Sequence, residues 1–218
     1  MKLLLTSSGI TNKSIENALS ELAGKPFSKL HLTFIPTAAN VEKGDKSWLV
    51  NDMNNFRKLG FASLDIIDIS AVSKDIWLRS FKKADILVLG GGNVEHLLKW
   101  MKKSGLKNLL PQLLETKIYV GISAGSMVTA KKISLSSSGI LYYEQTGNLK
   151  DVEGLALVRF ELFPHLNSKS FQKITVDYLQ KIAQKNLNTF YAIDDDTAIK
   201  VVNKTISIVS EGKWKKFN

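Results

Sequence analysis

The sequence contains no cysteine, and this absence excludes several chemistries at once. Without a thiol there is no disulfide framework, no thiolate metal site and no cysteine nucleophile. Long apolar runs are also missing, and no segment could span a bilayer as a helix. The apolar start, Leu3–Leu5, is too short for the core of a signal peptide. Nothing in the sequence indicates secretion, so we expect a cytoplasmic location.

Arginine is scarce although the chain is basic. Lys and Arg together number 30 against 20 Asp and Glu, a net charge of +10, but the arginines are only Arg57, Arg79 and Arg159. Arginine is the residue best suited to bidentate contacts with phosphates and bases. The lysines are scattered along the chain, as expected for a solvated basic surface. We therefore expect neither a nucleic acid nor a membrane as partner.

Apolar runs of strand length alternate with runs of helical periodicity. With 218 residues, of which 44% are hydrophobic, the chain suits a single domain over residues 1–218 with a substantial core. The alternation predicts an α/β fold, a three-layer sandwich with a mostly parallel central sheet. The expected strands are Lys2–Thr6, Leu30–Pro36, Ser63–Ile69, Asp85–Leu89 and Lys117–Ile122. The expected helices are Ser14–Ala23, Lys46–Leu59, Asp75–Lys83, Val94–Lys103, Leu109–Leu114 and Ala124–Lys131.

The second half of the chain has a different pattern. Residues Ser134–Asp151 show no clear period and are expected to form a long loop. A strand over Leu155–Leu162 and a helix over Ser168–Gln184 should follow it. Antiparallel strands are expected at the end, over Thr189–Ile193, Thr197–Val202 and Thr205–Val209, with a hairpin turn at Asn203-Lys204.

A Gly-x-Ser-x-Gly pattern spans Gly121–Gly125 and has Ser123 at its centre. It falls between a predicted strand and a predicted helix, which is the context of a nucleophile elbow. Such a turn strains the serine backbone and projects its hydroxyl from the carboxyl end of the sheet. The amide of Ala124 then lies at a helix N-terminus and can donate to a developing oxyanion. Ser123 is the candidate nucleophile; the alternative interpretation is a tight turn with an inert serine.

A glycine run, Gly90–Gly92, follows the strand that ends at Leu89. In a parallel sheet this loop lies at the same carboxyl edge as Ser123. Gly91 or Gly92 can therefore supply the second donor of an oxyanion hole, while Asn93 can cap the next helix. The run lacks the spacing of the known phosphate-binding loops.

His165 is the candidate general base among only three histidines. It follows a predicted strand, and an imidazole with a pKa near ~6.5 can take a serine proton at neutral pH and return it. The group that should hold the imidazole stays open. Glu144, Asp151 and Glu153 lie between Ser123 and His165, and Asn167 lies two residues beyond it.

Several short motifs occur together in the order found in the peptidase E family, which the chain resembles over nearly its whole length. They are Phe34–Ala38, Leu89–Asn93, Gly121–Gly125, Phe163–His165 and Asp194–Ala198. The family comprises aspartyl dipeptidases with a class I glutamine amidotransferase-like, flavodoxin-like fold, and cyanophycinase is a relative. The resemblance implies Ser123 as nucleophile, His165 as base and an oxyanion hole of Gly91, Gly92 and Ala124. It also implies small Asp-X peptides as substrates, without metal or cofactor. We expect a monomer or a homodimer.

Two departures from the family pattern limit that implication. The family has an acidic residue fifteen positions after the nucleophile, where this chain has Ser138. The family also recognises the substrate carboxylate with an arginine after the histidine, where this chain offers only Lys169 and Lys173, beside Asn93 as a further substrate-binding candidate. A non-catalytic member with a degraded triad and a cyanophycinase-like isopeptide hydrolase are therefore alternative hypotheses to an Asp-X dipeptidase.

Overall fold

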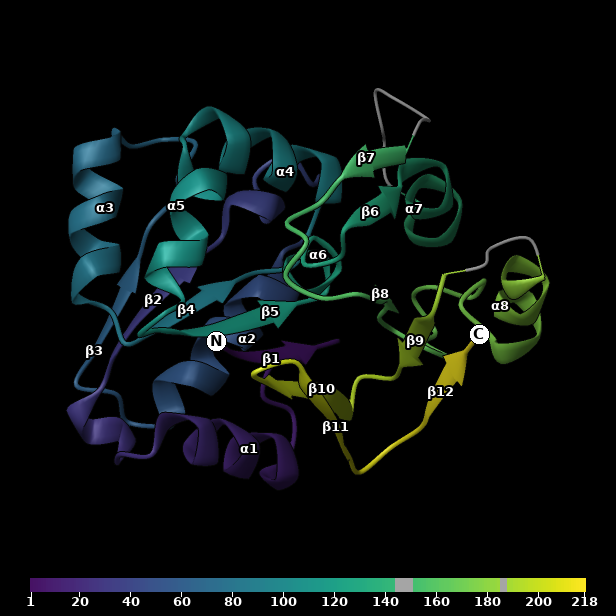
Figure 1. The fold of residues 1–218 in the computed structure, drawn as a ribbon, viewed down its shortest axis with the longest axis horizontal. Helices are drawn as coiled ribbons and strands as arrows, with labels where there is room; N and C mark the ends of the chain where they lie inside the picture. The colour runs from purple at the N-terminus through teal and green to yellow at the C-terminus, as the bar shows by residue number, and fades with distance from the viewer. Residues whose placement is uncertain (144–150, 185–187) are drawn as a thin grey trace.

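The structure is a computed structural model that describes residues 1–143, 151–184 and 188–218, without the side chains of residues 135 and 136. In the described residues the largest sheet has seven strands in the order β11-β10-β1-β5-β4-β2-β3 (Figure 1). The five strands β1, β5, β4, β2 and β3 run parallel to one another, whereas β10 and β11 pair antiparallel at one edge of the sheet. The bounds are β1 Lys2–Thr6, β2 His31–Ile35, β3 Ser63–Ile66, β4 Ile86–Leu89, β5 Ile118–Ile122, β10 Thr197–Val202 and β11 Thr205–Ser210.

Helices cover both faces of this sheet, because successive side chains of its central strands point to opposite sides. Leu3 and Leu5 of β1 pack into one core, and Leu4 between them packs into the other. The first core holds α3, α4 and α5, and the second holds α1 and α2 (Figure 1). The bounds are α1 Lys13–Ala23, α2 Ser47–Lys58, α3 Lys74–Lys83, α4 Val94–Lys103 and α5 Leu106–Leu113, with short 3₁₀ turns η1 Phe27–Lys29 and η2 Thr37–Ala39. The predicted three-layer α/β architecture is confirmed.

A smaller sheet stands beside the large one, at the right of Figure 1. Its strand order is β12-β9-β8, and α8 packs against it. Helix α6 lies between the two sheets, and the β6–β7 ladder and α7 lie at the upper right of Figure 1. The bounds are α6 Ala124–Met127, β6 Lys132–Ser134, α7 Leu135–Tyr142, β7 Asp151–Glu153, β8 Glu161–Phe163, α8 Val176–Ala183, β9 Phe190–Ile193 and β12 Trp214–Phe217.

Strand register brings the functional loops to one edge. Thr6 at the end of β1 pairs with Ile122 at the end of β5, and Leu89 at the end of β4 pairs with Gly121. The segments that follow these strands therefore leave the sheet together. They carry residues 7–9, Gly90–Gly92 and Ser123.

The predictions for the second half of the chain need correction. The expected loop Ser134–Asp151 contains helix α7 and ends in β7, and only its residues 144–150 lie outside the described residues. The expected strand Leu155–Leu162 shortens to β8 because its first part instead bonds back to the segment after α6, with the Leu155 amide donating to the Val128 carbonyl. The expected helix Ser168–Gln184 begins only at Val176, where Thr175 caps it.

Two further differences concern the strands and the helix near Ser123. Helix α6 ends at Met127 instead of Lys131, since the chain turns into the β6–β7 ladder. Strand β12 has no counterpart in the sequence-based predictions, and β9 pairs in parallel with β8 as well as antiparallel with β12. The hairpin at Asn203-Lys204 is confirmed, and both residues have the positive φ that its tight turn requires.

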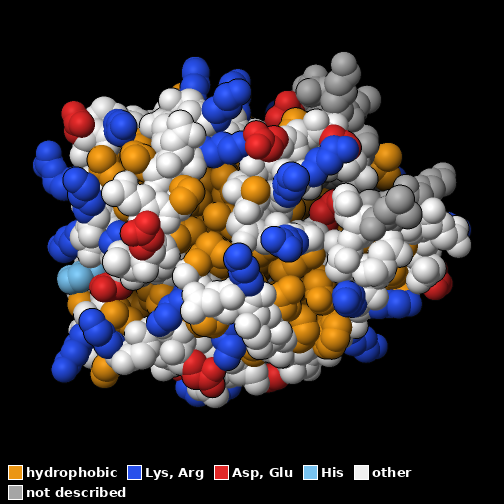
Figure 2. All heavy atoms as spheres, viewed as in Figure 1, with side chains coloured by type: hydrophobic (Ala, Val, Ile, Leu, Met, Phe, Trp, Pro, Cys, Tyr) orange, Lys and Arg blue, Asp and Glu red, His pale blue; other side chains and the backbone are white. Residues whose placement is uncertain are grey.

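Basic side chains are spread over the face shown in Figure 2, between acidic and apolar ones. Among the described residues, no helix combines the length and apolar character needed to cross a bilayer.

Candidate active site

Ser123 occupies a sharp turn between β5 and α6. Its φ of 46° and ψ of −110° are strained for a residue with a side chain. The turn is held by neighbours on both sides: the Ser123 amide donates to the Thr6 carbonyl, and the Ser123 carbonyl accepts from Ser126 and Met127. Gly125 is needed because a Cβ there would lie 2.0 Å from the Leu89 carbonyl oxygen. The Gly-x-Ser-x-Gly pattern thus reflects the close approach of this turn to β4.

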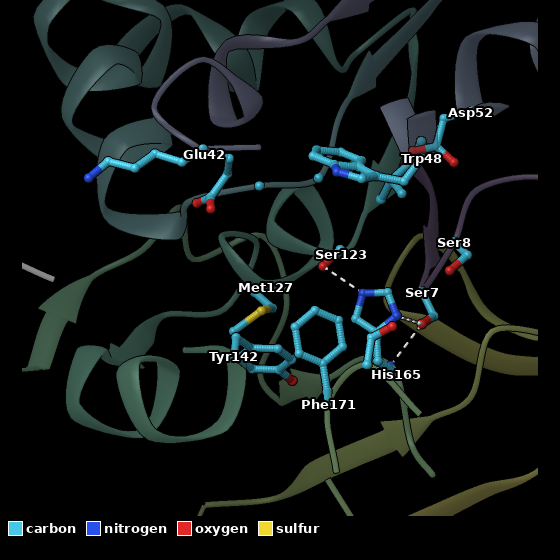
Figure 3. Close-up of a pocket in the computed structure, with 15 residues that line it drawn as sticks. Ser7, Ser8, Glu42, Trp48, Asp52, Ser123, Met127, Tyr142, His165 and Phe171 are labelled. Atoms are coloured by element: carbon cyan, nitrogen blue, oxygen red, sulfur yellow. Dashed lines mark hydrogen bonds between the residues drawn. The ribbon is translucent and has the colours of Figure 1, made fainter. Parts of the chain in front are cut away.

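His165 follows β8 and brings its ring to the serine from the smaller sheet. Its Nε2 lies 3.0 Å from the Ser123 hydroxyl oxygen (Figure 3). The His165 backbone has a positive φ of 65°, and its amide donates to the Ser7 hydroxyl oxygen at 2.8 Å. Phe171 packs on the imidazole with ring centroids 4.8 Å apart. These contacts fix the ring that faces Ser123.

Asp195 lies on the other side of the imidazole, in the segment between β9 and β10. Its Oδ1 lies 2.7 Å from His165 Nδ1 and also accepts from the hydroxyls of Ser7 at 2.6 Å and Ser8 at 2.8 Å. Burial opposes ionisation of this carboxyl, but the hydrogen bond and charge of His165 and the two hydroxyls outweigh it and lower the pKa of Asp195 to about 2. A carboxylate only accepts, so Nδ1 carries the ring proton and Nε2 is left to accept from Ser123.

The structure brings Asp195 to the imidazole, and none of the three candidates from the sequence that it describes. Asn167 is exposed and binds through its backbone amide to the Ile174 carbonyl. Asp151 pairs with Lys132 and Glu153 with Lys107 on the β6–β7 side, while Glu144 lies outside the described residues.

Asp195 has a signal in the sequence that the search between Ser123 and His165 passes over. It is the middle residue of Asp194-Asp195-Asp196, one of the motifs shared with the peptidase E family. A polar run directly after an apolar strand marks a strand end, where catalytic groups gather. Extending the search beyond His165 to such strand ends would have included it.

Three backbone amides surround the serine. Gly91 lies so close that a Cβ there would be 3.3 Å from Ser123 Cβ, and Gly92 follows with a φ of 122°. A side chain at Gly92 would collide with the Ala38 carbonyl oxygen, 2.3 Å from its Cβ position. Across the part of the chain that the structure describes, the amides of Gly91, Gly92 and Ala124 have no assigned acceptor. They are available to a ligand beside Ser123.

The residues expected to bind substrate are placed elsewhere. Asn93 is 6% exposed, and its side chain caps α4 by accepting from the His96 amide at 2.9 Å. Lys169 and Lys173 are exposed and do not line the pocket, and the ammonium group of Lys173 lies over the Tyr143 ring instead. Ser138 is buried in α7 and lines a different, much smaller cavity.

A pocket of about 290 Å³ opens above Ser123 and His165 (Figure 3). Its size is at the small end for ligand sites. One wall comes from α2 and the segment before it, which the sequence did not connect with the site. The lining residues are Ser7, Ser8, Glu42, Lys43, Trp48, Asp52, Gly91, Gly92, Ile122, Ser123, Met127, Tyr142, His165, Ser170 and Phe171. Among the described residues there is no group of three or more His, Cys, Asp or Glu side chains that could hold a metal ion.

One family model and several relatives match most of the chain. The model of peptidase family S51 matches residues 3–209. An uncharacterized peptidase from Listeria innocua is 30% identical over 192 residues, covering 84% of this chain and 88% of the relative. An uncharacterized peptidase from Pasteurella multocida is 32% identical over 180 residues, covering 80% and 82%.

Solved structures show the same similarity in three dimensions. The crystal structure of a candidate peptidase E protein from Listeria monocytogenes has a TM-score of 0.80 and 27% identity, covering 97% of this chain and 98% of that one. A peptidase from an acI-B1 actinobacterium shares the fold, with a TM-score of 0.73, 19% identity and coverage of 98% and 88%.

Proposed function

Because the chain belongs to peptidase family S51, we propose that it is a serine peptidase that hydrolyses short peptides with Ser123, His165 and Asp195 as its triad. The observation that carries the proposal is the unbroken chain of contacts, 3.0 Å from Ser123 to His165 and 2.7 Å from His165 to Asp195. Geometry of this kind defines a triad independently of the order of its members along the chain.

The three members of the proposed triad have different tasks in the reaction. The Ser123 oxygen attacks the peptide carbonyl carbon while His165 Nε2 accepts the hydroxyl proton. The resulting imidazolium gives that proton to the leaving amine as the C–N bond breaks. Water then attacks the acyl-enzyme ester while His165 Nε2 takes its proton. The C–O bond to Ser123 breaks, the proton passes to the Ser123 oxygen, and the acid product leaves. Asp195, ionised throughout, keeps the proton on Nδ1 and stabilises the imidazolium.

The glycine loop and the elbow supply the oxyanion hole in this proposal. The candidate donors are the amides of Gly91, Gly92 and Ala124, which belong to the segments beside Ser123 and have no acceptor among the described residues. Each donor in such a hole is worth about 3–4 kcal/mol of transition-state stabilisation. The buried Ser138 does not weaken the proposal, because Asp195 provides the carboxylate from another part of the chain.

A preference for Asp as the first residue is the second part of the proposal. Within the described residues, Lys43 is the only Lys or Arg that lines the pocket. An exposed lysine on a flexible stem can reach a substrate carboxylate as a point charge, although without the bidentate geometry of arginine. Lys43, and neither Lys169 nor Lys173, is therefore the proposed partner of an acidic side chain.

Labelling and turnover together test the assignment of the nucleophile. The wild-type protein should react with a fluorophosphonate at Ser123 with one label per chain and should cleave Asp-Leu. Ser123→Ala should do neither. Ser170→Ala removes another serine of the same pocket and serves as the matched control, with labelling retained. Turnover that is equal in wild type and Ser123→Ala would refute the proposal.

A further inference from the structure

Asp52 is a buried acidic side chain in the wall of the active-site pocket that the triad does not use. It lies on α2, is 9% exposed, and lines the pocket together with Ser123 and His165. Figure 3 shows it beside Trp48, on the side of the pocket where Ser8 lies. Helix α2 therefore presents a carboxyl group to whatever occupies the pocket.

The Asp52 carboxyl has no partner in the described part of the chain. No hydrogen bond or ion pair to its oxygens is found there, although buried charges in proteins are normally paired. Burial, together with the smaller effect of the charge of Asp195, raises the pKa of Asp52 to about 7. The charged form of such a carboxyl is unfavourable without a partner and becomes favourable once a cation binds it.

The Asp52 carboxyl lies near Ile122, the residue that directly precedes the nucleophile. A Cβ on Gly9 would lie 3.3 Å from the Ile122 side chain and 3.5 Å from Asp52 Oδ1, so the carboxyl and Ile122 border the same small space. Ile122 directly precedes Ser123. In the first residue of a peptide, the α-ammonium is attached to the carbon that carries the carbonyl, and so it lies close to the bond under attack.

We propose that Asp52 binds the free α-ammonium group of the substrate, so that the enzyme cleaves peptides next to their amino terminus and rejects blocked ones. This inference rests on the serine peptidase function proposed above. An ammonium supplies the positive charge and the three donors that the carboxyl lacks. The small pocket favours the α-ammonium over the ε-ammonium of a substrate lysine, whose longer stem needs more room.

The test compares free and blocked versions of the same peptide. Asp-Leu and N-acetyl-Asp-Leu are hydrolysed by wild type, Asp52→Asn and Glu42→Gln, with product measured by mass spectrometry. Glu42 is a half-buried carboxylate of the same pocket and makes Glu42→Gln the matched control. A third peptide, N-acetyl-Lys-Leu, offers only a side-chain ammonium. Fluorophosphonate titration fixes the concentration of active sites in each sample.

Wild type and Glu42→Gln should prefer the free peptide by about tenfold to hundredfold in kcat/KM, as expected for a hydrogen bond between charged groups. Asp52→Asn should lose most of this preference, chiefly through a higher KM for Asp-Leu. Equal rates on free and acetylated Asp-Leu in a wild type that takes up the label would overturn the inference and leave the serine peptidase intact. Preference for N-acetyl-Lys-Leu over N-acetyl-Asp-Leu that depends on Asp52 would overturn it in favour of a side-chain ammonium. Absence of labelling would instead count against the triad.

Discussion

Replacing Asp52 by asparagine should make the protein more stable at alkaline pH and should stabilise it much less in mild acid. The pKa of the Asp52 carboxyl rises from 3.8 to about 7 on folding, mainly because of burial. The folded state therefore holds this proton more tightly than the unfolded state. As a consequence, the free energy of unfolding falls as the pH rises from about 4 to about 7.

The size of the effect follows from the shift. A difference of about 3 pKa units at 1.36 kcal/mol each gives a ceiling on the order of 4 kcal/mol above pH 7. Asparagine has nearly the same shape and never ionises, so Asp52→Asn avoids this cost. For a chain of 218 residues, each kcal/mol changes Tm by roughly 2–4 °C. We expect Asp52→Asn to raise Tm by several degrees at pH 8.

Thermal unfolding followed by circular dichroism at pH 5 and pH 8 measures this difference. The increase in Tm over wild type should be present at pH 8 and should shrink towards pH 5. Glu42→Gln, which removes another carboxylate from the same pocket, is measured beside it as the matched control. A change in Tm for Asp52→Asn that is the same at both pH values would refute the argument from burial.

Four further predictions concern the site and its support. Asp195→Asn should lower kcat on Asp-Leu by about 10³-fold to 10⁴-fold, because the imidazole loses its fixed tautomer. In the wild type, the pKa of Asp195 is lowered to about 2, so its contribution to stability is present above about pH 4. Thermal unfolding should show this contribution being lost only as the pH falls towards 2. Ser7→Ala removes the hydroxyl that joins the His165 amide to Asp195 and should lower kcat about tenfold with little change in KM. Gly125→Ala should lower the free energy of unfolding by about 3 kcal/mol or more in urea denaturation, whereas Gly44→Ala, with no atom within 4 Å of its Cβ position, should cost only about 1 kcal/mol. Lys43→Met should reduce the preference for Asp-Leu over Ala-Leu, and an unchanged ratio would remove Lys43 from substrate recognition.

The first half of the fold could be predicted because its signals are local. Buried parallel strands appear as continuous apolar runs. Leu3–Leu5 and Ile86–Leu89 are such runs, and a strand with one face in water would expose half of their side chains. The nucleophile turn is local as well, because both the glycine at 125 and the strained serine at 123 are required by the close approach of this turn to β4.

The carboxylate that we propose as the acid of the triad lies at a strand end, but local reasoning does not say which strand end faces His165. Asp195 lies 30 residues after His165, and tertiary packing alone brings the two together. A search that follows the usual chain order of serine, acid and histidine looks only before His165. The order here is serine, histidine and acid.

The residues that line the pocket walls could not be predicted from the sequence either. Lys43 and Asp52 precede the nucleophile by more than seventy positions and meet it only because α2 packs against the end of the sheet. Lys169 and Lys173 are near His165 in sequence, but the irregular segment before α8 turns Phe171 towards the imidazole and leaves both lysines in solvent. Nearness along the chain was a poor guide to nearness at the site.

The serine and the histidine are attached to different sheets. Ser123 follows β5 of the large sheet and His165 follows β8 of the small one. Asp195 lies in the segment that joins β9 of the small sheet to β10 of the large one. Their contacts exist only while the two sheets remain docked, so any loosening of that junction separates the hydroxyl from the imidazole before either sheet unravels. On gradual heating, peptide cleavage should accordingly disappear at a lower temperature than the bulk of the helical signal.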